Sequence, residues 1–243
     1  MKKVFLTLFA AAVSVAVMAQ TDFWMWHNGT ATKMVAADSI TFTEPEFSYE
    51  AVDLGLSVKW ATFNVGATKP EEYGDYFAWG ETSPHETETY DMDSYALTSD
   101  GYTFITCTDE NGNLTSEYDA ATVNWGGAWR MPTEIELQEL MNTDNCTWTW
   151  YAAGNTKYSG VAGIEVTSKK NGYTDKSIFL PAAGFQGDSE LIDAGTYVNI
   201  WSASLNTYNV QCAICMYSSS SVEPGLSNFR TRYSGIPVRP VCK

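Results

Sequence analysis

The stretch VNWGGAWRMPTEIELQELMN (residues 123–142) predicts a tight turn that leads into a short, half-buried helix. Thr133 and Glu136 match the capping box, in which the side chain of each satisfies a free backbone N–H of the other. Pro132, directly before them, disfavours helical backbone upstream. The apolar residues that follow recur at the spacing of one helical face: Leu137, Leu140 and Met141. We therefore expect a helix over residues 133–142 that buries this face.

The residues before this helix have the character of a structural brace. Gly126 and Gly127 permit a tight backbone turn that side chains would block. Arg130 stands between Trp129 and Met131, and an arginine in a buried approach to a helix needs a carboxylate or several carbonyl oxygens as partners. For Arg130, contact with a substrate is the alternative to this structural role. We interpret eight residues as structural: Trp125, Gly126, Gly127, Trp129, Arg130, Pro132, Thr133 and Glu136.

The rest of the chain after residue 48 predicts a β-rich α+β domain with one or two short helices. Residues 52–60 alternate strictly between apolar and polar, which predicts a strand with Val52 and Trp60 on the same face. The polar stretch 81–119 predicts a long ordered loop with a turn at Asn111-Gly112. Further strands are expected near residues 76–79, 161–167, 177–180, 199–203, 210–217 and 236–239.

The first 48 residues predict a leader and a small β-element. Residues 1–19 have two lysines and then an apolar run that ends in small residues, the layout of a signal peptide, although an uncleaved anchor has the same composition. Apolar runs flank Asn28-Gly29, which predicts a hairpin, and residues 39–43 predict another short strand. We take residues 20–48 as an element that packs on the domain 49–243 or is donated to another chain.

The negative charge of the chain and its expected export limit the classes of partner that it can bind. The formal net charge is −15, and removal of the leader leaves 12 basic residues against 29 acidic ones. Such a surface repels nucleic acid and anionic membranes. No later segment is apolar for long enough to span a bilayer, and no cysteine near the cleavage point suits a lipid anchor. We expect a secreted or cell-surface protein without membrane insertion.

The five cysteines are an odd number for an exported chain, so at least one thiol is expected to stay free or to pair with another chain. Our preferred bridge joins Cys146, just past the helix, to Cys242, and would contribute about 4–5 kcal/mol by closing a long loop. Cys212 and Cys215 form a CxxC, but a zinc site needs a second ligand pair at suitable spacing. We therefore predict no metal and no cofactor.

Five segments resemble, in the same order, the Fibrobacter succinogenes major paralogous domain family: VDLGLSVKWATFNVGA (52–67), YGDYFAWGE (73–81), ATVNWGGAWRMPT (121–133), SIFLPAAG (177–184) and GIPVRPVC (235–242). IWSAS (200–204) is similar to that family's Trp-Ser-Ser-Ser segment. The resemblance covers roughly residues 50–243. It implies a C-type-lectin-like fold, similar to that of formylglycine-generating enzymes, in which the C-terminal strand returns beside the N-terminal one.

The departures from these relatives limit what the resemblance implies about activity. Calcium-dependent lectins use Glu-Pro-Asn or Gln-Pro-Asp with Trp-Asn-Asp, whereas this chain has only Glu223-Pro224-Gly225 after the helix and no Trp-Asn-Asp. Cys212 and Cys215 do not lie in the copper-binding motif of formylglycine-generating enzymes. The sequence therefore predicts neither a calcium-dependent sugar site nor an oxidase.

The leading hypothesis is a binding or adhesion module that recognises a glycan or a surface protein without calcium. Loops on a rigid scaffold commonly carry recognition, and residues 185–199 and 205–234 contain side chains that can stack on sugars or anchor an interface: Tyr197, Tyr208, Arg230 and Tyr233. A hydrolase or oxidase and a structural subunit of a surface assembly are the alternatives.

Overall fold

The computed structural model describes residues 23–27, 30–34, 49–99 and 103–243. The chain divides into two units, 1–48 and 49–243. In the first unit, β1 (Phe23–His27) pairs antiparallel with β2 (Thr30–Met34), with Phe23 opposite Met34. The predicted signal peptide and the strand predicted at 39–43 lie outside the described residues.

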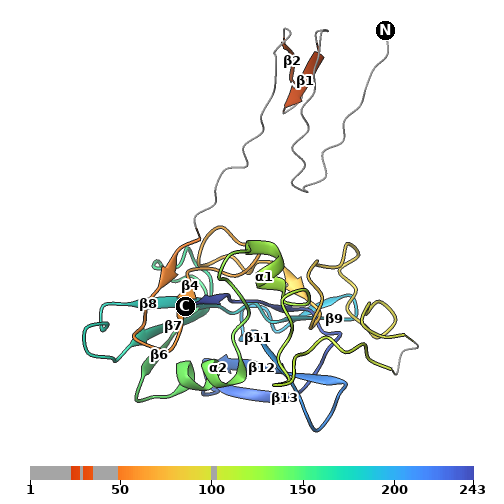
Figure 1. Ribbon diagram of the computed structural model, residues 1–243. Helices are drawn as coiled ribbons and strands as arrows, with labels where there is room; N and C mark the ends of the chain where they lie inside the picture. Colours follow the sequence, from red (N-terminus) through yellow and green to blue (C-terminus); the bar gives the residue numbers. More distant parts are fainter. Residues whose placement is uncertain (1–22, 28–29, 35–48, 100–102) are drawn as a thin grey trace. The chain divides into compact units, whose positions relative to one another are not determined.

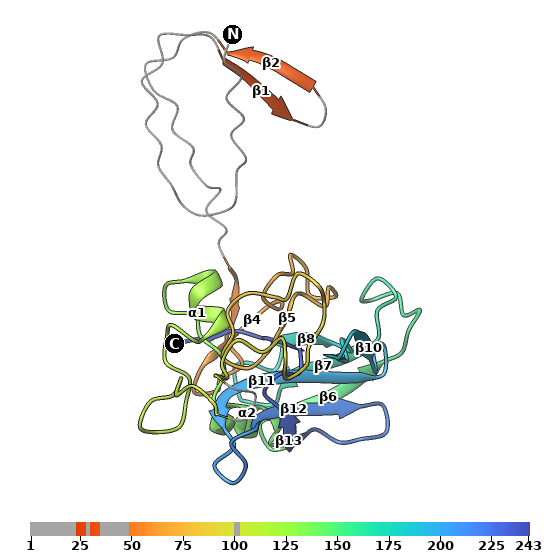
Figure 2. The same cartoon turned by 90° about the vertical axis from the view of Figure 1, so that its right-hand side faces the viewer.

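The second unit is a β-rich α+β domain, as the sequence predicts. Its two helices are short: α1 (Ala120–Trp125) and α2 (Glu134–Met141). Two three-stranded antiparallel sheets contain its longest strands, one of β6 (Cys146–Tyr151), β7 (Gly163–Ser168) and β8 (Ser177–Pro181), the other of β11 (Tyr197–Leu205), β12 (Cys212–Ser219) and β13 (Gly225–Thr231). Figure 2 shows β11, β12 and β13 next to one another. The likeness to C-type lectins stays a prediction.

Shorter pairings complete the domain. Strand β4 (Lys59–Ala61) lies between β3 (Ala51–Val52) and β15 (Val241–Cys242), so the end of the chain pairs beside its beginning. Strand β5 (Tyr76–Phe77) pairs with β14 (Ile236–Pro237), and β9 (Phe185–Gly187) forms a hairpin with β10 (Glu190–Ile192). Within the described part of the chain, no helix combines the length and apolarity that a bilayer span requires.

Helix α2 packs against β11 and β12 (Figure 1) because its apolar face is turned inward. Leu137 and Leu140 are fully buried in a core that also contains Trp60, Ile200 and Met216. A second core contains most of the other large buried rings, and there two tryptophans cross-link distant segments. Trp79 donates its indole N–H to the carbonyl of Ser202, and Trp201 donates to the carbonyl of Phe77.

The predicted continuous strand over residues 52–60 is wrong in its middle. Only its ends, β3 and β4, are strands, and they pair with each other with Val52 opposite Trp60. Asp53 accepts a hydrogen bond from the N–H of Gly55, which has a φ of 71°, a backbone conformation suited to a turn. The apolar residues Leu54 and Val58 are still buried, but they reach the core from a loop.

The predicted bridge between Cys146 and Cys242 is also absent. All five cysteines lie in the described part of the chain and all are free thiols. Cys146 begins β6 and pairs opposite Ser168, whereas Cys242 ends β15 opposite Lys59. The two residues therefore belong to different sheets. The helix and the C-terminal strand are joined instead through Arg130, as described below.

The segment before the C-terminal strand is held by an arginine that is fully buried. Arg239 donates hydrogen bonds to Asn64 Oδ1 and to the carbonyls of Ala61 and Phe179, at 2.8–2.9 Å. Burial lowers the pKa of Arg239, while the three acceptor oxygens favour its charged form. This side chain ties the end of the chain to β8, to the last residue of β4 and to Asn64 just after it.

Candidate functional site

A cleft of about 370 Å³ opens between the β9–β10 hairpin, the C-terminal part of β13 and the loop that carries Tyr90. We call it the Arg230 cleft. Its aromatic and charged lining comes from three separate parts of the sequence: Tyr90, Phe185, Asp188, Phe229, Arg230 and Tyr233. Aromatic side chains with a few polar groups are the usual lining of a site that binds a small molecule or a sugar.

Backbone pairing holds the walls of the Arg230 cleft. Tyr90 and Asp188 exchange two N–H···O bonds of 2.6 and 3.0 Å, which fasten the Tyr90 loop to the hairpin. Gln186 and Gly235 exchange two more, of 2.7 and 2.9 Å, on the other side. The hairpin is therefore fixed between two distant segments, so the cleft is largely preformed.

Tyr90 is a rigid wall because its ring and its hydroxyl are both engaged. The ring stacks on His85, with centroids 4.3 Å apart and planes within 2°. The hydroxyl accepts from the N–H of His85 and donates to the carbonyl of Tyr76. Burial raises the pKa of Tyr90 to about 12, so the hydroxyl keeps its proton at neutral pH. Gly235 allows this packing, because a Cβ there would lie 2.8 Å from the Tyr90 ring.

His85 is in turn held by two acceptors. Its Nδ1 lies 2.5 Å from the carbonyl of Thr89, and its Nε2 lies 2.5 Å from Glu81 Oε2. Both ring nitrogens face an oxygen, so the two contacts fix the orientation of the ring. This pair forms the support behind Tyr90 and does not line the cleft itself.

Arg230 contributes the positive charge of the cleft. Its guanidinium carbon lies 3.8 Å from the centroid of the Phe185 ring, a cation–π contact. Its Nε is buried and, within the described part of the chain, has no hydrogen-bond partner. Among the described residues, no carboxylate lies within ion-pair distance of Arg230.

The rim combines an exposed ring with a carboxylate. Phe229 precedes Arg230 on β13 and is 87% exposed. Asp188 lies at the tip of the β9–β10 hairpin, where its φ of 50° is left-handed. The cleft therefore offers ring faces, one cation and one carboxylate.

Two of the four ligand-binding residues predicted from the sequence line the cleft, and two do not. Arg230 and Tyr233 belong to its lining. Tyr197 begins β11 opposite Ser219, outside the lining. Tyr208 is 96% exposed in the connection between β11 and β12, also outside it. The structure thus brings Arg230 and Tyr233 together and separates the other two.

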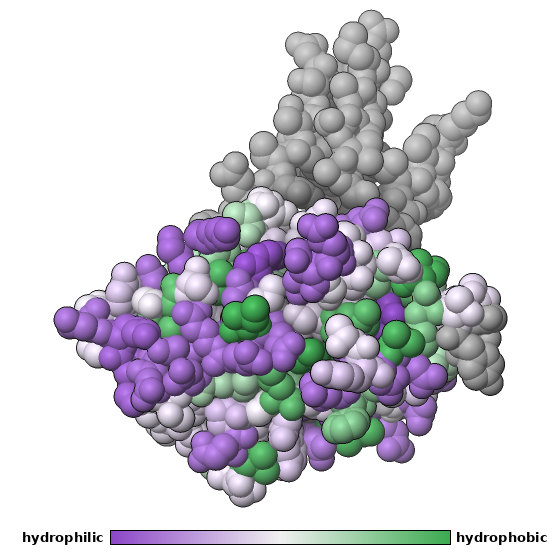
Figure 3. All heavy atoms as spheres, turned by 60° about the horizontal axis from the view of Figure 1, so that its bottom comes forward, coloured by the Kyte–Doolittle hydropathy of each residue, from purple (hydrophilic) through white to green (hydrophobic). Residues whose placement is uncertain are grey.

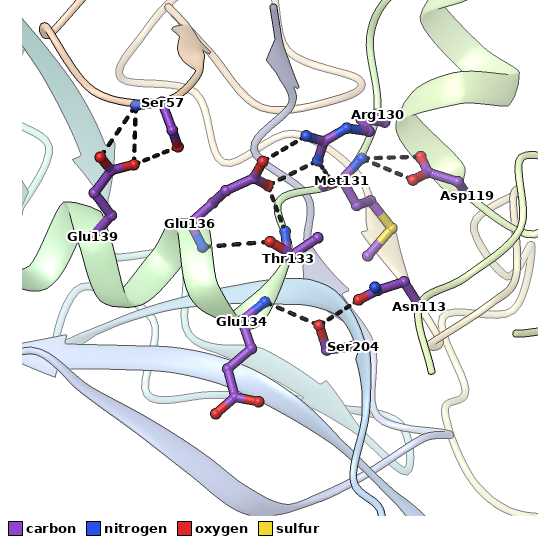
Figure 4. A network of polar contacts seen from close by, with 10 residues as sticks. All are labelled: Ser57, Asn113, Asp119, Arg130, Met131, Thr133, Glu134, Glu136, Glu139 and Ser204. Carbon is purple, nitrogen blue, oxygen red and sulfur yellow. Dashed lines mark hydrogen bonds and ion pairs between the residues drawn. The ribbon is translucent and has the colours of Figure 1, made fainter. Parts of the chain in front are cut away.

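None of the brace residues lines the cleft, and three of them, Arg130, Thr133 and Glu136, contact one another (Figure 4). Arg130 makes a two-pronged ion pair with Glu136, at 2.8 Å from Nη1 to Oε2 and 2.5 Å from Nη2 to Oε1. Glu136 also accepts from the N–H of Thr133, and Thr133 Oγ1 accepts from the N–H of Glu136, which completes the capping box. Arg130 and Val241 exchange two backbone hydrogen bonds, so this segment pairs with the C-terminal strand.

The same segment is tied to α1 and to β11. Asp119 caps α1 by accepting from the N–H of Thr122, and both of its carboxylate oxygens accept from the N–H of Met131. The carbonyl of Pro132 accepts from the N–H of Ala203 on β11. Burial raises the pKa of Asp119, and the N–H groups of Thr122 and Met131 oppose that effect.

The two tryptophans and the two glycines of the brace lie next to α1. Trp125 ends α1 and stacks on Tyr49, with centroids 3.8 Å apart, and Trp129 meets Trp125 edge-on. Gly126 and Gly127 lie between these tryptophans with φ of 66° and 60°, values that favour glycine. The rings are half-buried, so the tryptophans pack against side chains of the same unit.

None of the described clusters has the make-up of a metal or redox centre. Within the part of the chain that the structure describes, no three metal-binding side chains converge. Cys212 and Cys215 are both buried in β12, and burial raises the pKa of Cys215 to about 11. Such a thiol stays neutral at pH 7, whereas redox chemistry and metal binding use the thiolate.

Sequence reasoning misses the residues that complete the cleft. Tyr90 and Phe185 stand in polar or irregular stretches, and only the pairing of Tyr90 with Asp188 brings them together. Phe229 adjoins Arg230 and could have been found as its neighbour. The face shown in Figure 3 has its hydrophobic residues in small islands among hydrophilic ones, so this face offers no broad apolar surface that would compete as a candidate site.

Comparisons of the chain with protein-family models, with curated proteins and with solved structures found no match.

Proposed function

We propose that this protein is a secreted or cell-surface binding module that recognises a glycan, without calcium, in the Arg230 cleft. The observation that carries the proposal is the make-up of that cleft: several aromatic side chains surround a cation on walls that backbone pairing fixes. Sugars present apolar faces that stack on rings, and hydroxyls that bond to polar groups.

The lining favours binding over hydrolysis. A glycosidase usually places two carboxyl groups across the scissile bond. Of the described residues that line the cleft, Asp188 alone carries a carboxylate. A single carboxylate can accept hydrogen bonds from sugar hydroxyls, which suits recognition.

A glycan array with matched variants tests this proposal. Phe229→Ser removes an exposed ring from the cleft rim, and Tyr208→Ser removes an equally exposed ring from outside the cleft. Because both rings are largely in solvent, neither change should disturb folding. We expect Phe229→Ser to weaken glycan binding by about two- to tenfold, the value of one stacking contact, and Tyr208→Ser to leave it unchanged.

Two outcomes would contradict the proposal. The first is that the full-length protein binds no glycan on the array. The second is that both variants bind like the parent, which would place recognition elsewhere. If Tyr208→Ser instead abolished capture of a surface protein, the module would be a protein binder that uses another face.

A further inference from the structure

Arg230 differs from the other arginines of this chain in what its side chain contacts. The chain has three others, and each donates hydrogen bonds to acceptors within the protein: Arg130, Arg232 and Arg239. Arg232, for example, donates to the hydroxyl of Tyr95 and the carbonyl of Val210 in a buried cluster of rings. Arg230 donates to no oxygen of a described residue; its side chain contacts the Cys215 thiol and lines the cleft.

No group near Arg230 provides a counter-charge. The Cys215 thiol contacts Arg230, but burial raises the pKa of Cys215 to about 11, so that thiol is neutral at pH 7. Asp188 lines the same cleft and forms no ion pair with Arg230. Of the four arginines only Arg130 pairs with a described carboxylate, and of the three without such a pair only Arg230 lines the cleft.

The position of the guanidinium suits a planar anion. Stacking on Phe185 restrains the side chain, and it leaves the N–H edge to bond with a ligand. A carboxylate accepts two parallel N–H bonds from such an edge. The Nε of Arg230 is buried, so the edge that can reach a ligand is the one formed by the two Nη groups.

From these contacts we infer that the Arg230 cleft selects a sugar that bears a carboxylate, with the carboxylate on Arg230, the hydroxyls on Asp188 and the ring beside Phe229. The inference rests on the proposed function and gives it a ligand class. Each of the three chemical features of an acidic sugar then has one matching group in the lining.

The test is binding of the full-length protein to oligosaccharides of glucuronic, galacturonic and neuraminic acid, each compared with its carboxyl-reduced form. We expect at least one acid to bind at least about tenfold more tightly than its reduced form. Added salt should weaken binding of that acid and leave the reduced form unaffected. This comparison uses the unaltered protein, so it does not depend on the folding of a variant.

Variants at Arg230 then locate the effect. Arg230→Gln should remove the preference for the acid. Arg230→Lys should keep it only in part, because lysine lacks the planar guanidinium that donates two parallel N–H bonds. Lys176→Gln is the control, since it removes the same charge from an exposed residue paired with Asp175. Thermal unfolding of each variant confirms that it is folded.

The outcomes separate the inference from the proposed function. Equal binding of acid and reduced forms, or a preference for a sulfated glycan over every carboxylated one, would overturn the inference and leave the glycan module intact. Loss of preference in Lys176→Gln equal to that in Arg230→Gln would also overturn it, because overall charge would then explain the effect. Absence of any glycan binding would refute the proposed function itself.

Discussion

Replacement of Glu136 by glutamine tests whether the segment before α2 is a brace. The Glu136 carboxylate accepts from both Nη atoms of Arg130 and from the N–H of Thr133. Glutamine can keep the bond to Thr133, since it also fits a capping box, but it loses the charge and one of the two bonds to Arg130. The ion pair is partly buried, with 12% of the Glu136 side chain and 32% of the Arg130 side chain exposed.

These contacts determine how much stability the substitution should remove. A net charge-assisted hydrogen bond contributes about 1.5–3 kcal/mol when buried, and partial exposure of Arg130 reduces that value. We expect Glu136→Gln to lower the free energy of unfolding by about 2 kcal/mol. Glu136→Ala should cost about 1 kcal/mol more, because the bond to Thr133 is then also lost.

Urea unfolding at pH 7 is the assay, with Glu134→Gln as the control. Glu134 lies on the same first turn, but from the described residues its carboxylate accepts only an exposed bond, from Gln138. The control should therefore cost about 0.5 kcal/mol or less. A loss in Glu136→Gln no larger than that of the control would refute the brace, and the fold would then depend on apolar packing alone.

The same carboxylate makes part of the stability depend on pH. Burial pushes the pKa of Glu136 upward, but the bonds from Arg130 and Thr133 outweigh it and hold the pKa below its ordinary value of 4.5. A group whose pKa is lower in the folded state stabilises the fold above its unfolded pKa, and this stabilisation is lost as the pH falls through the folded pKa. The difference between the parent and Glu136→Gln should therefore be full at pH 7 and should shrink as the pH falls below about 4.5.

Two further predictions concern thiols and the buried arginine. A thiol reagent should modify five cysteines in denaturant but only Cys242 rapidly in the native protein, since the other four are buried; a count of three in denaturant would mean that a bridge forms. Arg239→Lys should lower the free energy of unfolding by about 3 kcal/mol, measured by urea unfolding, because a lysine cannot reach all three acceptors that Arg239 satisfies. A loss below about 1 kcal/mol would show that water or a shifted backbone satisfies those oxygens.

Local signals in the sequence predict local structure well in this protein. The start of α2 follows from Thr133 and Glu136, because a capping box needs only residues three apart. Most expected strands occur within a few residues of their predicted places. The sequence reading misses α1, whose β-branched Thr122 and Val123 disfavour a helix that the Asp119 cap nevertheless begins. It also misses β13, which lacks a regular alternation.

What the sequence by itself determined is the fold class, the capped helix and the need of Arg130 for a partner, because these depend on neighbours along the chain. Only the tertiary structure decided that residues 53–58 form a loop and that Arg230 remains without a carboxylate. Both arginines follow an aromatic residue, yet Arg130 finds Glu136 six residues on, whereas Arg230 meets Phe185 from a distant hairpin. Contacts between segments so far apart in the chain follow from the packing of the sheets, which no local pattern encodes.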